Sequence, residues 1–292
     1  GSDKALPGVK FVVWNNSVAP ESIGMIDEKL YVTDEKGQII LQGLVPGEYC
    51  VAEAESIPGY AFDPEKVYEF TVTEDGRING KGEYVLTIEN EKTKITETNA
   101  IEVLSDTQSA YPFKDVTIID TVSMANLMPG EEYVLKGVLA DQLTGIPLRE
   151  NNSLTGDEIT VEQEFLATEG SMDVEVTFEH LDLSVFAGRK IVVYEYLHQD
   201  GTEISVHNDL DDEKQQIQVM EPKLKTTAID VASGTHESIA KKDVTIRDNV
   251  EYFDIIPGLK YTLKGIVMDQ ATGKPLLING KEITAEKEVT IS

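Results

Sequence analysis

The sequence predicts an all-β protein built from several β-sandwich domains in tandem. Short runs rich in Val, Ile, Tyr, Phe and Thr recur along the whole chain, and turn signals such as VPGE, EDGR and MPGE separate them. No convincing amphipathic helix interrupts the pattern. Short strands with frequent turns are typical of sandwiches, and 292 residues is too long for one small β domain.

The strands are expected where β-branched and aromatic residues alternate or cluster. The clearest runs are residues 10–14, 68–73, 83–89, 115–120, 132–139, 173–179 and 190–196.

An internal repeat organises the second half of the chain. The run TNAIEV at 98–103 returns as TTAIDV at 226–231, an offset of 128 residues, and the run at 128–148 returns at 256–276. About half of the positions between 98 and 150 are identical at this offset without a gap, which indicates a tandem repeat.

Three domains follow from this repeat. The first spans residues 1–91 and does not share it, the second spans 92–220, and the third, 221–292, carries the N-terminal part of a second copy and is truncated. The joint QVMEPKLKTT contains Pro222 and is short, so it predicts a stiff connector.

The charge excludes several classes of function. Asp and Glu number 53 against 25 Lys and Arg, which gives a formal charge of −28. A nucleic-acid binder needs a basic footprint, and anchoring on anionic lipid needs basic residues too. The sequence therefore indicates a soluble, self-repelling surface protein that contacts neither nucleic acid nor membrane.

Cys50 is the single cysteine, so an internal disulfide is excluded. It lies in the alternating run GEYCVAE and is expected to be a small buried apolar group, because nothing nearby supplies a base for a nucleophile.

Within the first domain, the run TDEKGQIILQGLVPGEYCVAEAESIPGY combines a D-x-x-G turn, the pattern G-L-x-P-G-x-Y and a strand that carries a glutamate. This run resembles the Cna B-type (SpaA-like, prealbumin-like) domains of Gram-positive surface proteins and pilins. The resemblance implies a β-sandwich in which a buried acid promotes a lysine–asparagine isopeptide bond. By position, Glu53 matches the acid and Asn90 the asparagine.

The lysine of that family is missing from the pattern. It lies on a strand that would precede residue 3, and Lys4 and Lys10 fall at other positions. We therefore expect no isopeptide bond here, and an ordinary acid on a strand face remains the alternative for Glu53.

The second domain ends in KIVVYEYLHQDGTEISVHNDLDDEKQQIQV, which contains V-V-x-E and H-x-D-x-x-D-x-x-Q. This run resembles the VaFE-repeat, or T-Q ester-bond, domains of Gram-positive surface adhesins, and departs from them at Gln216, where threonine is usual. The resemblance implies an Ig-like domain with an ester between Thr98 and Gln215. It also implies three helper residues and two counterparts in the second copy: Asp120, Glu195 and His207, then Thr226 and Asp248.

The chemistry of these residue types is coherent. A threonine hydroxyl is a weak nucleophile, and neutral His207 could act as its base. Asp120 and Glu195 in an apolar core would share one proton, and a protonated carboxyl bonded to the amide oxygen would polarise the amide. The first and last strands of an Ig-like sandwich can lie side by side, so distant residues would meet.

Other interpretations compete for the same residues. His207 could be a surface turn histidine, and the acidic run 209–213 could bind calcium or form a solvated turn. The four histidines show no zinc-ligand spacing and no G-x-S-x-G occurs, so neither a metal, a cofactor nor a Ser-His-Asp hydrolase is expected.

The function expected is structural. The chain is predicted to be the stalk of an extracellular, cell-wall-anchored Gram-positive adhesin, in which the bond-forming residues act once on their own chain rather than as a turnover enzyme. Its partners would be neighbouring domains of the same protein, with a host ligand at a distal domain. The alternative is a ligand-binding module that recognises a host protein or glycan, with Trp14 as the candidate contact.

Overall fold

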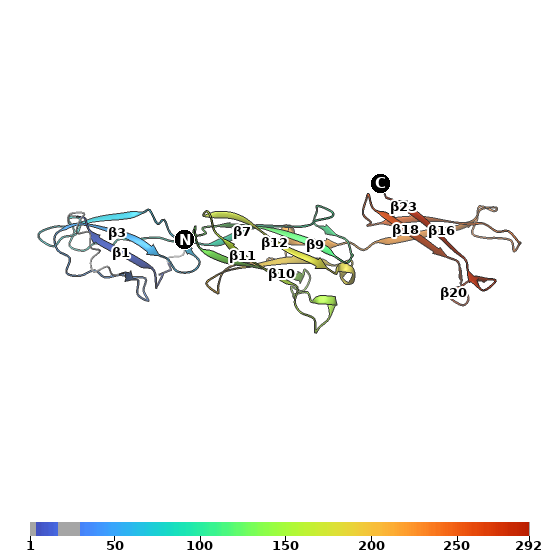
Figure 1. Ribbon diagram of the computed structural model, residues 1–292, viewed down its shortest axis with the longest axis horizontal. Coiled ribbons are helices and arrows are strands. Elements are labelled where there is room, and N and C mark those ends of the chain that lie inside the picture. The colour runs from blue at the N-terminus through green and yellow to red at the C-terminus, as the bar shows by residue number, and fades with distance from the viewer. Residues whose placement is uncertain (1–3, 17–29, 292) are drawn as a thin grey trace.

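The computed structural model describes residues 4–16 and 30–291, and places three β units in a row along the long axis (Figure 1). Within these residues, helical geometry is confined to the 3-10 turns η3 (Glu150–Asn152), η4 (Leu183–Phe186) and η5 (Glu213–Gln215). The predicted all-β fold class is confirmed.

The first unit contains a four-stranded antiparallel sheet in the order β2-β1-β3-β5. Its strands are β1 (Lys10–Asn15), β2 (Tyr31–Val32), β3 (Gly47–Glu55) and β5 (Val67–Val72), and a short pair, β4 (Tyr60–Ala61) and β6 (Glu91–Lys92), lies apart from it. Alternate residues of β1 point into the core beside Tyr49 and Phe70, whose rings stack 5.2 Å apart.

The strand predicted at 83–89 is wrong, because this segment forms no ladder in the structure. Its alternating side chains Tyr84, Leu86 and Ile88 nevertheless pack against the core of the first unit. Period-two alternation therefore marked a half-buried extended segment rather than a hydrogen-bonded strand.

The second unit is a sandwich of two sheets around one large apolar core. One sheet has the order β12-β9-β7, and the other has the order β11-β10-β13-β15-β8, with β14 paired to β13. The strands are β7 (Lys94–Glu102), β8 (Ser109–Ala110), β9 (Val116–Ala125), β10 (Glu132–Asp141), β11 (Thr160–Leu166), β12 (Ser171–Leu181), β13 (Lys190–Gln199), β14 (Thr202–His207) and β15 (Gln216–Val219).

The beginning of the second unit divides between the two sheets. Strand β7 pairs with β9 in the smaller sheet, whereas β8 crosses to the larger sheet and pairs in parallel with the last strand, β15. The last strand is thus paired with β8, and β7, although it belongs to the other sheet, also lies close to β15.

The third unit consists of separate two-stranded pairs. They are β16 (Lys223–Asp230) with β17 (Ile246–Phe253), β18 (Lys260–Ile266) with β23 (Thr284–Thr290), β19 (Met268–Asp269) with β20 (Lys274–Pro275), and β21 (Leu277–Ile278) with β22 (Lys281–Glu282). Side chains that would line a core, such as Tyr252, Phe253 and Leu277, are exposed.

The first two units meet at a packed joint. The backbone N–H of Gly59 donates to Gln199 Oε1 at 2.8 Å, and Thr93 N–H donates to Gly59 O at 2.9 Å. Gly59 has φ +82°, and a Cβ there would lie 3.0 Å from Ile204, which belongs to the core of the second unit. A turn of the first unit is therefore seated on the hairpin of β13 and β14.

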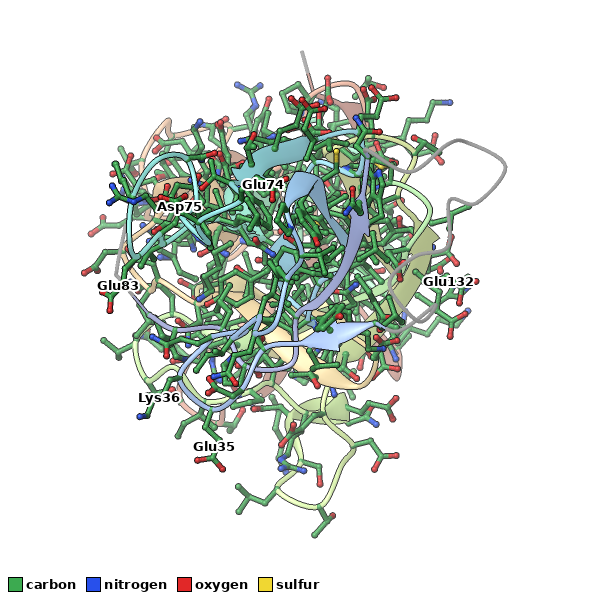
Figure 2. The ribbon with its side chains drawn as sticks, turned by 90° about the vertical axis from the view of Figure 1, so that its left-hand side faces the viewer. Glu35, Lys36, Glu74, Asp75, Glu83 and Glu132 are labelled. Carbon is green, nitrogen blue, oxygen red and sulfur yellow. The ribbon has the colours of Figure 1, made fainter. Side chains whose placement is uncertain are left out.

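Acidic side chains project from the surface. Viewed along the long axis, the labelled side chains of Glu35, Glu83 and Glu132 point away from the centre of the molecule (Figure 2). None of the helices in the described ranges has the length and apolar character needed to cross a membrane.

Candidate functional site

Two carboxyl groups face each other inside the second unit. Asp120 lies on β9 opposite Ala100 of β7, and Glu195 lies on β13 of the other sheet opposite His207 of β14. Both carboxyls are fully buried. Burial raises the pKa of Asp120 to about 6; burial, reinforced by the neighbouring Asp120, holds the pKa of Glu195 well above its usual range. The pair therefore retains a proton at neutral pH.

A glycine lets apolar side chains of the facing sheet approach Glu195. Gly137 of β10 is the cross-strand partner of Glu195. A Cβ at Gly137 would lie 2.8 Å from Phe178 and 2.8 Å from Val176, both on the facing sheet. The absence of a side chain lets the two sheets approach closely beside Glu195, so apolar groups surround the carboxyl.

The Gln215 side chain enters the same core from η5 and is fully buried. Its Nε2 atom donates to Val193 O at 2.7 Å and to Glu195 Oε2 at 2.8 Å, and lies 3.4 Å from His207 O. The expectation that a carboxyl would bond the amide oxygen is not what the structure shows, because Glu195 contacts the amide nitrogen. Two backbone carbonyls beside that atom also require a donor, which fixes this orientation of the amide.

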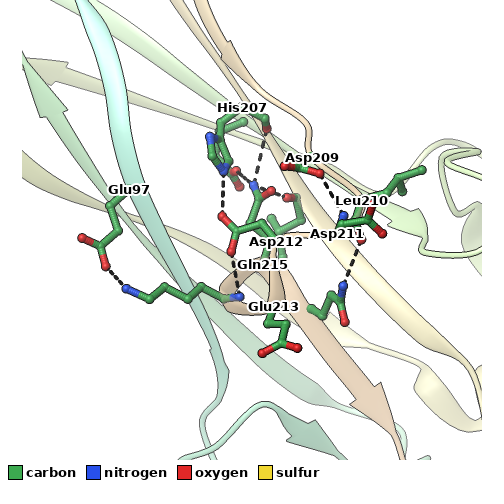
Figure 3. A network of polar contacts seen from close by, with 12 residues as sticks. Glu97, His207, Asp209, Leu210, Asp211, Asp212, Glu213 and Gln215 are labelled. Carbon is green, nitrogen blue, oxygen red and sulfur yellow. Dashed lines mark hydrogen bonds and ion pairs between the residues drawn. The ribbon is translucent and has the colours of Figure 1, made fainter.

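Thr98 is brought to Gln215 by its own strand. Glu97, which precedes Thr98 on β7, forms an ion pair with Lys214, which precedes Gln215 on η5 (Figure 3). Strand β7 contacts η5 directly. Strand alternation turns Glu97 to solvent and Thr98 into the core, where it is fully buried.

Buried oxygens without partners gather at this site. Among the described residues, six buried side-chain oxygens have no hydrogen-bond partner, and five of them belong to Thr98, Asp120, Glu195 and Gln215. Leaving a buried polar atom unpaired costs about 1–3 kcal/mol, so such a concentration is unusual for a purely structural core. One proton shared between the two carboxyls would satisfy part of the deficit.

His207 is held by Asp212, which belongs to the acidic run 209–213 that the sequence predicts as a solvated turn or a calcium site. His207 Nε2 lies 3.0 Å from Asp212 Oδ2, and both side chains are about three-quarters buried (Figure 3). Asp212 also caps η5, since its Oδ1 accepts from Lys214 N–H at 3.0 Å. Its interpretation as a solvated acid is therefore wrong, although Asp209 and Asp211 are exposed as expected. Asp212 links His207 to the segment that carries Gln215.

The first unit contains a second group of buried polar side chains. Glu53 on β3 is 6% exposed, and its Oε1 accepts from Asn90 Nδ2 at 2.6 Å, while Oε2 is the sixth unpaired oxygen. Burial raises the pKa of Glu53, and hydrogen bonds from Asn90 and Ser56 oppose this rise. Lys10 is engaged elsewhere, with its Nζ 2.7 Å from both carboxylate oxygens of Glu55. The acid and the amide expected from the sequence are thus together, without Lys10.

The third unit repeats the strand pairing of the second unit, but the matching side chains are not buried. Thr226 pairs with Val250 as Thr98 pairs with Val122, and Asp248 pairs with Ala228 as Asp120 pairs with Ala100. Both Thr226 and Asp248 are exposed.

The other residues considered as functional sites show no comparable arrangement of reactive groups in the described part of the chain. Among residues 4–16 and 30–291, no group of His, Cys, Asp and Glu is arranged to hold a metal ion. Cys50 is buried, as predicted. Trp14 lies on β1 opposite Cys50 and is half-buried.

Comparison with protein families defines the class of domain. The model of the T-Q ester bond containing domain matches residues 92–219 and 222–292, and that of a prealbumin-like fold domain, SpaA, matches residues 1–92. Because the first covers more than half of the chain, the protein belongs to the family of T-Q ester bond containing domains, and both predicted resemblances are confirmed.

Solved structures resemble the chain at low identity. A bacterial adhesin from Mobiluncus mulieris containing intramolecular disulfide, isopeptide and ester bond cross-links is 14% identical, with 69% of this chain and 94% of that chain covered and a TM-score of 0.38. The major pilin subunit BcpA of Bacillus cereus is 15% identical, with 99% and 82% covered and a TM-score of 0.28. The major pilin SpaD from Corynebacterium diphtheriae is 11% identical, with 94% and 66% covered and a TM-score of 0.30. No curated protein matches the chain.

Proposed function

We propose that the protein is a stalk segment of a Gram-positive cell-surface adhesin, anchored to the cell wall, whose second unit closes an ester between Thr98 and Gln215. The observation that carries this proposal is the cluster of unpaired buried oxygens on Thr98, Asp120, Glu195 and Gln215. These atoms lack partners because they are reactants and helpers of a bond-forming step. The adhesin and pilin structures named above support the location at the cell surface.

The reaction is an acyl transfer within one chain. With its Nε2 held by Asp212, His207 accepts the hydroxyl proton of Thr98 at Nδ1. Thr98 Oγ1 then attacks the side-chain carbonyl carbon of Gln215. As the C–N bond breaks, Glu195 supplies the proton that makes the leaving group ammonia, and the proton held by His207 returns the carboxyl pair to its singly protonated state. The net products are one ester and one ammonia.

The surroundings of Gln215 Nε2 suit this leaving group. Val193 O, Glu195 Oε2 and His207 O surround the nitrogen, at 2.7, 2.8 and 3.4 Å. An amide nitrogen has two N–H donors, whereas ammonia has three. Three acceptors therefore match the product side of the reaction better than the starting amide, which favours departure.

A chain that modifies itself once is not a turnover enzyme, and its benefit is mechanical. The ester would join β7 at the entrance of the unit to η5 just before its exit, so tension would pass from strand to strand through covalent bonds. In a protein with a single cysteine, an ester can replace the disulfides that other extracellular domains use.

Stretching single molecules tests the proposal. Pulled from its two ends, the unmutated second unit should not release the 117 residues between positions 98 and 215 (215 − 98). The Thr98→Val variant should release them, lengthening the chain by about 40 nm at roughly 3.5 Å per residue. Release of that length by the unmutated chain would refute the mechanical role of the ester.

A further inference from the structure

The acidic loop that carries Asp212 is fastened to the outside of the larger sheet of the second unit. On that face, away from the main core, five sheet residues and one loop residue form a separate apolar cluster, called here the outer-face cluster: Val138, Ala140, Val192, Tyr194, Tyr196 and Leu210. Leu210 is the member contributed by the loop between β14 and η5.

Leu210 is enclosed from both sides. Beneath it lies the outer-face cluster, and above it lies the turn at Gly145, where a Cβ would stand 3.5 Å from Leu210 Cδ1. Two side-chain amides hold its backbone: Gln216 Nε2 donates to Leu210 O at 2.9 Å, and Gln142 Nε2 donates to the same oxygen at 3.2 Å. Lys190 Nζ in turn donates to Gln216 Oε1 at 3.0 Å.

The loop needs such an attachment because its other side chains repel one another. Asp209, Asp211 and Glu213 are exposed acids within five residues, and Asp212 adds a fourth charge. Without an apolar contact, this charge density favours an open loop in solvent. The two residues whose geometry matters, His207 and Asp212, flank Leu210 on either side (Figure 3).

Resting on the proposed ester reaction, we propose that Leu210 and Gln216 are positioning residues for it: they clasp the loop 208–212 to the outer face of the sheet and so hold Asp212 against His207. The Gln216 amide bonds Leu210 O and Lys190 Nζ, and the Leu210 side chain packs on the outer-face cluster, on the other side of the sheet from the main core. Gln216 thus serves to hold the loop backbone. A shift of about 1 Å in a positioned catalytic group can cost about a hundredfold in rate.

The rate of ester formation tests the clasp. The full chain is made by cell-free translation, quenched in acid and denaturant at successive times, and its loss of ammonia is followed by intact mass. Leu210→Ala should slow the loss at least about tenfold. Leu210→Met, which conserves volume and apolar character, should restore the rate to within about twofold.

Gln216→Ala should slow the reaction in the same direction. The matched control is Gln218→Ala on the same strand, because Gln218 Nε2 donates to Arg189 O and Val219 O and not to the loop. This control should react at the parent rate. If circular dichroism shows that the Leu210→Ala chain has lost its strands, its rate says nothing about positioning. The difference in rate between Gln216→Ala and Gln218→Ala then tests the positioning role.

A double-mutant cycle separates positioning from general loosening of the fold. If Leu210 acts through Asp212, then Leu210→Ala should have no further effect in an Asp212→Ala background. If the rate losses of Leu210→Ala and Asp212→Ala multiply in the double variant, Leu210 does not act through Asp212. A parent rate in both Leu210→Ala and Gln216→Ala would likewise show that these residues do not position the loop. Either result would overturn the positioning role and leave the ester intact. An unmutated chain that loses no ammonia would instead overturn the proposed function, and the clasp with it.

Discussion

Replacement of Thr98 by valine would measure what the ester contributes to stability. The Thr98 side chain is fully buried, and its Oγ1 has no hydrogen-bond partner in the described part of the chain. Valine has a similar shape, so the change removes the bond-forming oxygen without breaking a hydrogen bond of the folded state.

The magnitude follows from the loop that the bond closes. A cross-link across 117 residues (215 − 98) restricts the unfolded chain by about 5 kcal/mol in the chain-entropy model used for disulfides. For a unit of this size, such a loss lowers the Tm by roughly 15–25 °C.

Scanning calorimetry of the full chain is the assay, with Thr226→Val as the matched control. Thr226 occupies the same register on β16 but is exposed, so its replacement should change stability by less than about 0.5 kcal/mol. Equal melting of the Thr98→Val variant and the parent chain would refute the covalent account of stability.

Three other changes have defined outcomes. In the uncross-linked Thr98→Val chain, the raised pKa of Asp120 means that the folded state binds a proton more tightly than the unfolded state. Stability should therefore fall as pH rises from about 4 through 6, by roughly 3 kcal/mol for Asp120 alone. Urea titrations should show this slope, and Asp120→Asn should reduce it, whereas an unchanged slope would show that Asp120 is not its source. Glu195→Gln keeps the volume but has no proton to give, so its intact mass should retain the ammonia; loss of ammonia by this variant would exclude Glu195 as the donor. Gly59→Ala adds a Cβ 3.0 Å from Ile204 at φ +82°, costing about 1–2 kcal/mol at the joint, so NMR relaxation should report looser coupling between the first two units; unchanged tumbling would contradict the packed joint.

The strands were predictable where the local sequence pattern matches the way the segment packs in the fold. Residues 98–103 and 226–231 share a sequence, and β7 and β16 share a pairing register with β9 and β17. Alternation failed at 83–89 because it reports which side chains are half-buried and not whether the backbone has a ladder partner.

The sequence predicted which residues form the candidate site better than it predicted how their side chains are oriented. Resemblance supplied Thr98, Gln215 and three helper residues, but not the orientation of the Gln215 amide, which is set by two backbone carbonyls that no motif encodes. Asp212 fills the second Asp of H-x-D-x-x-D-x-x-Q, but its position among other acids suggested a solvated turn, and no role was assigned to it. Only the fold shows that Asp212 lies beside His207.

Leu210 gave a weaker signal still. One apolar residue within an acidic loop was the only trace of it in the sequence, and the sheet face that receives it is assembled from β10 and β13, far away in the chain. Contacts of this kind depend on tertiary packing and cannot be deduced from local pattern.

The intact mass of the unmutated, purified chain tests the central claim most directly. We expect a chain lighter than its sequence mass by a single ammonia, and a proteolytic map in which the peptide of Thr98 remains joined to the peptide of Gln215. A chain with its full sequence mass would contradict the account, as would an ammonia lost from any residue other than Gln215.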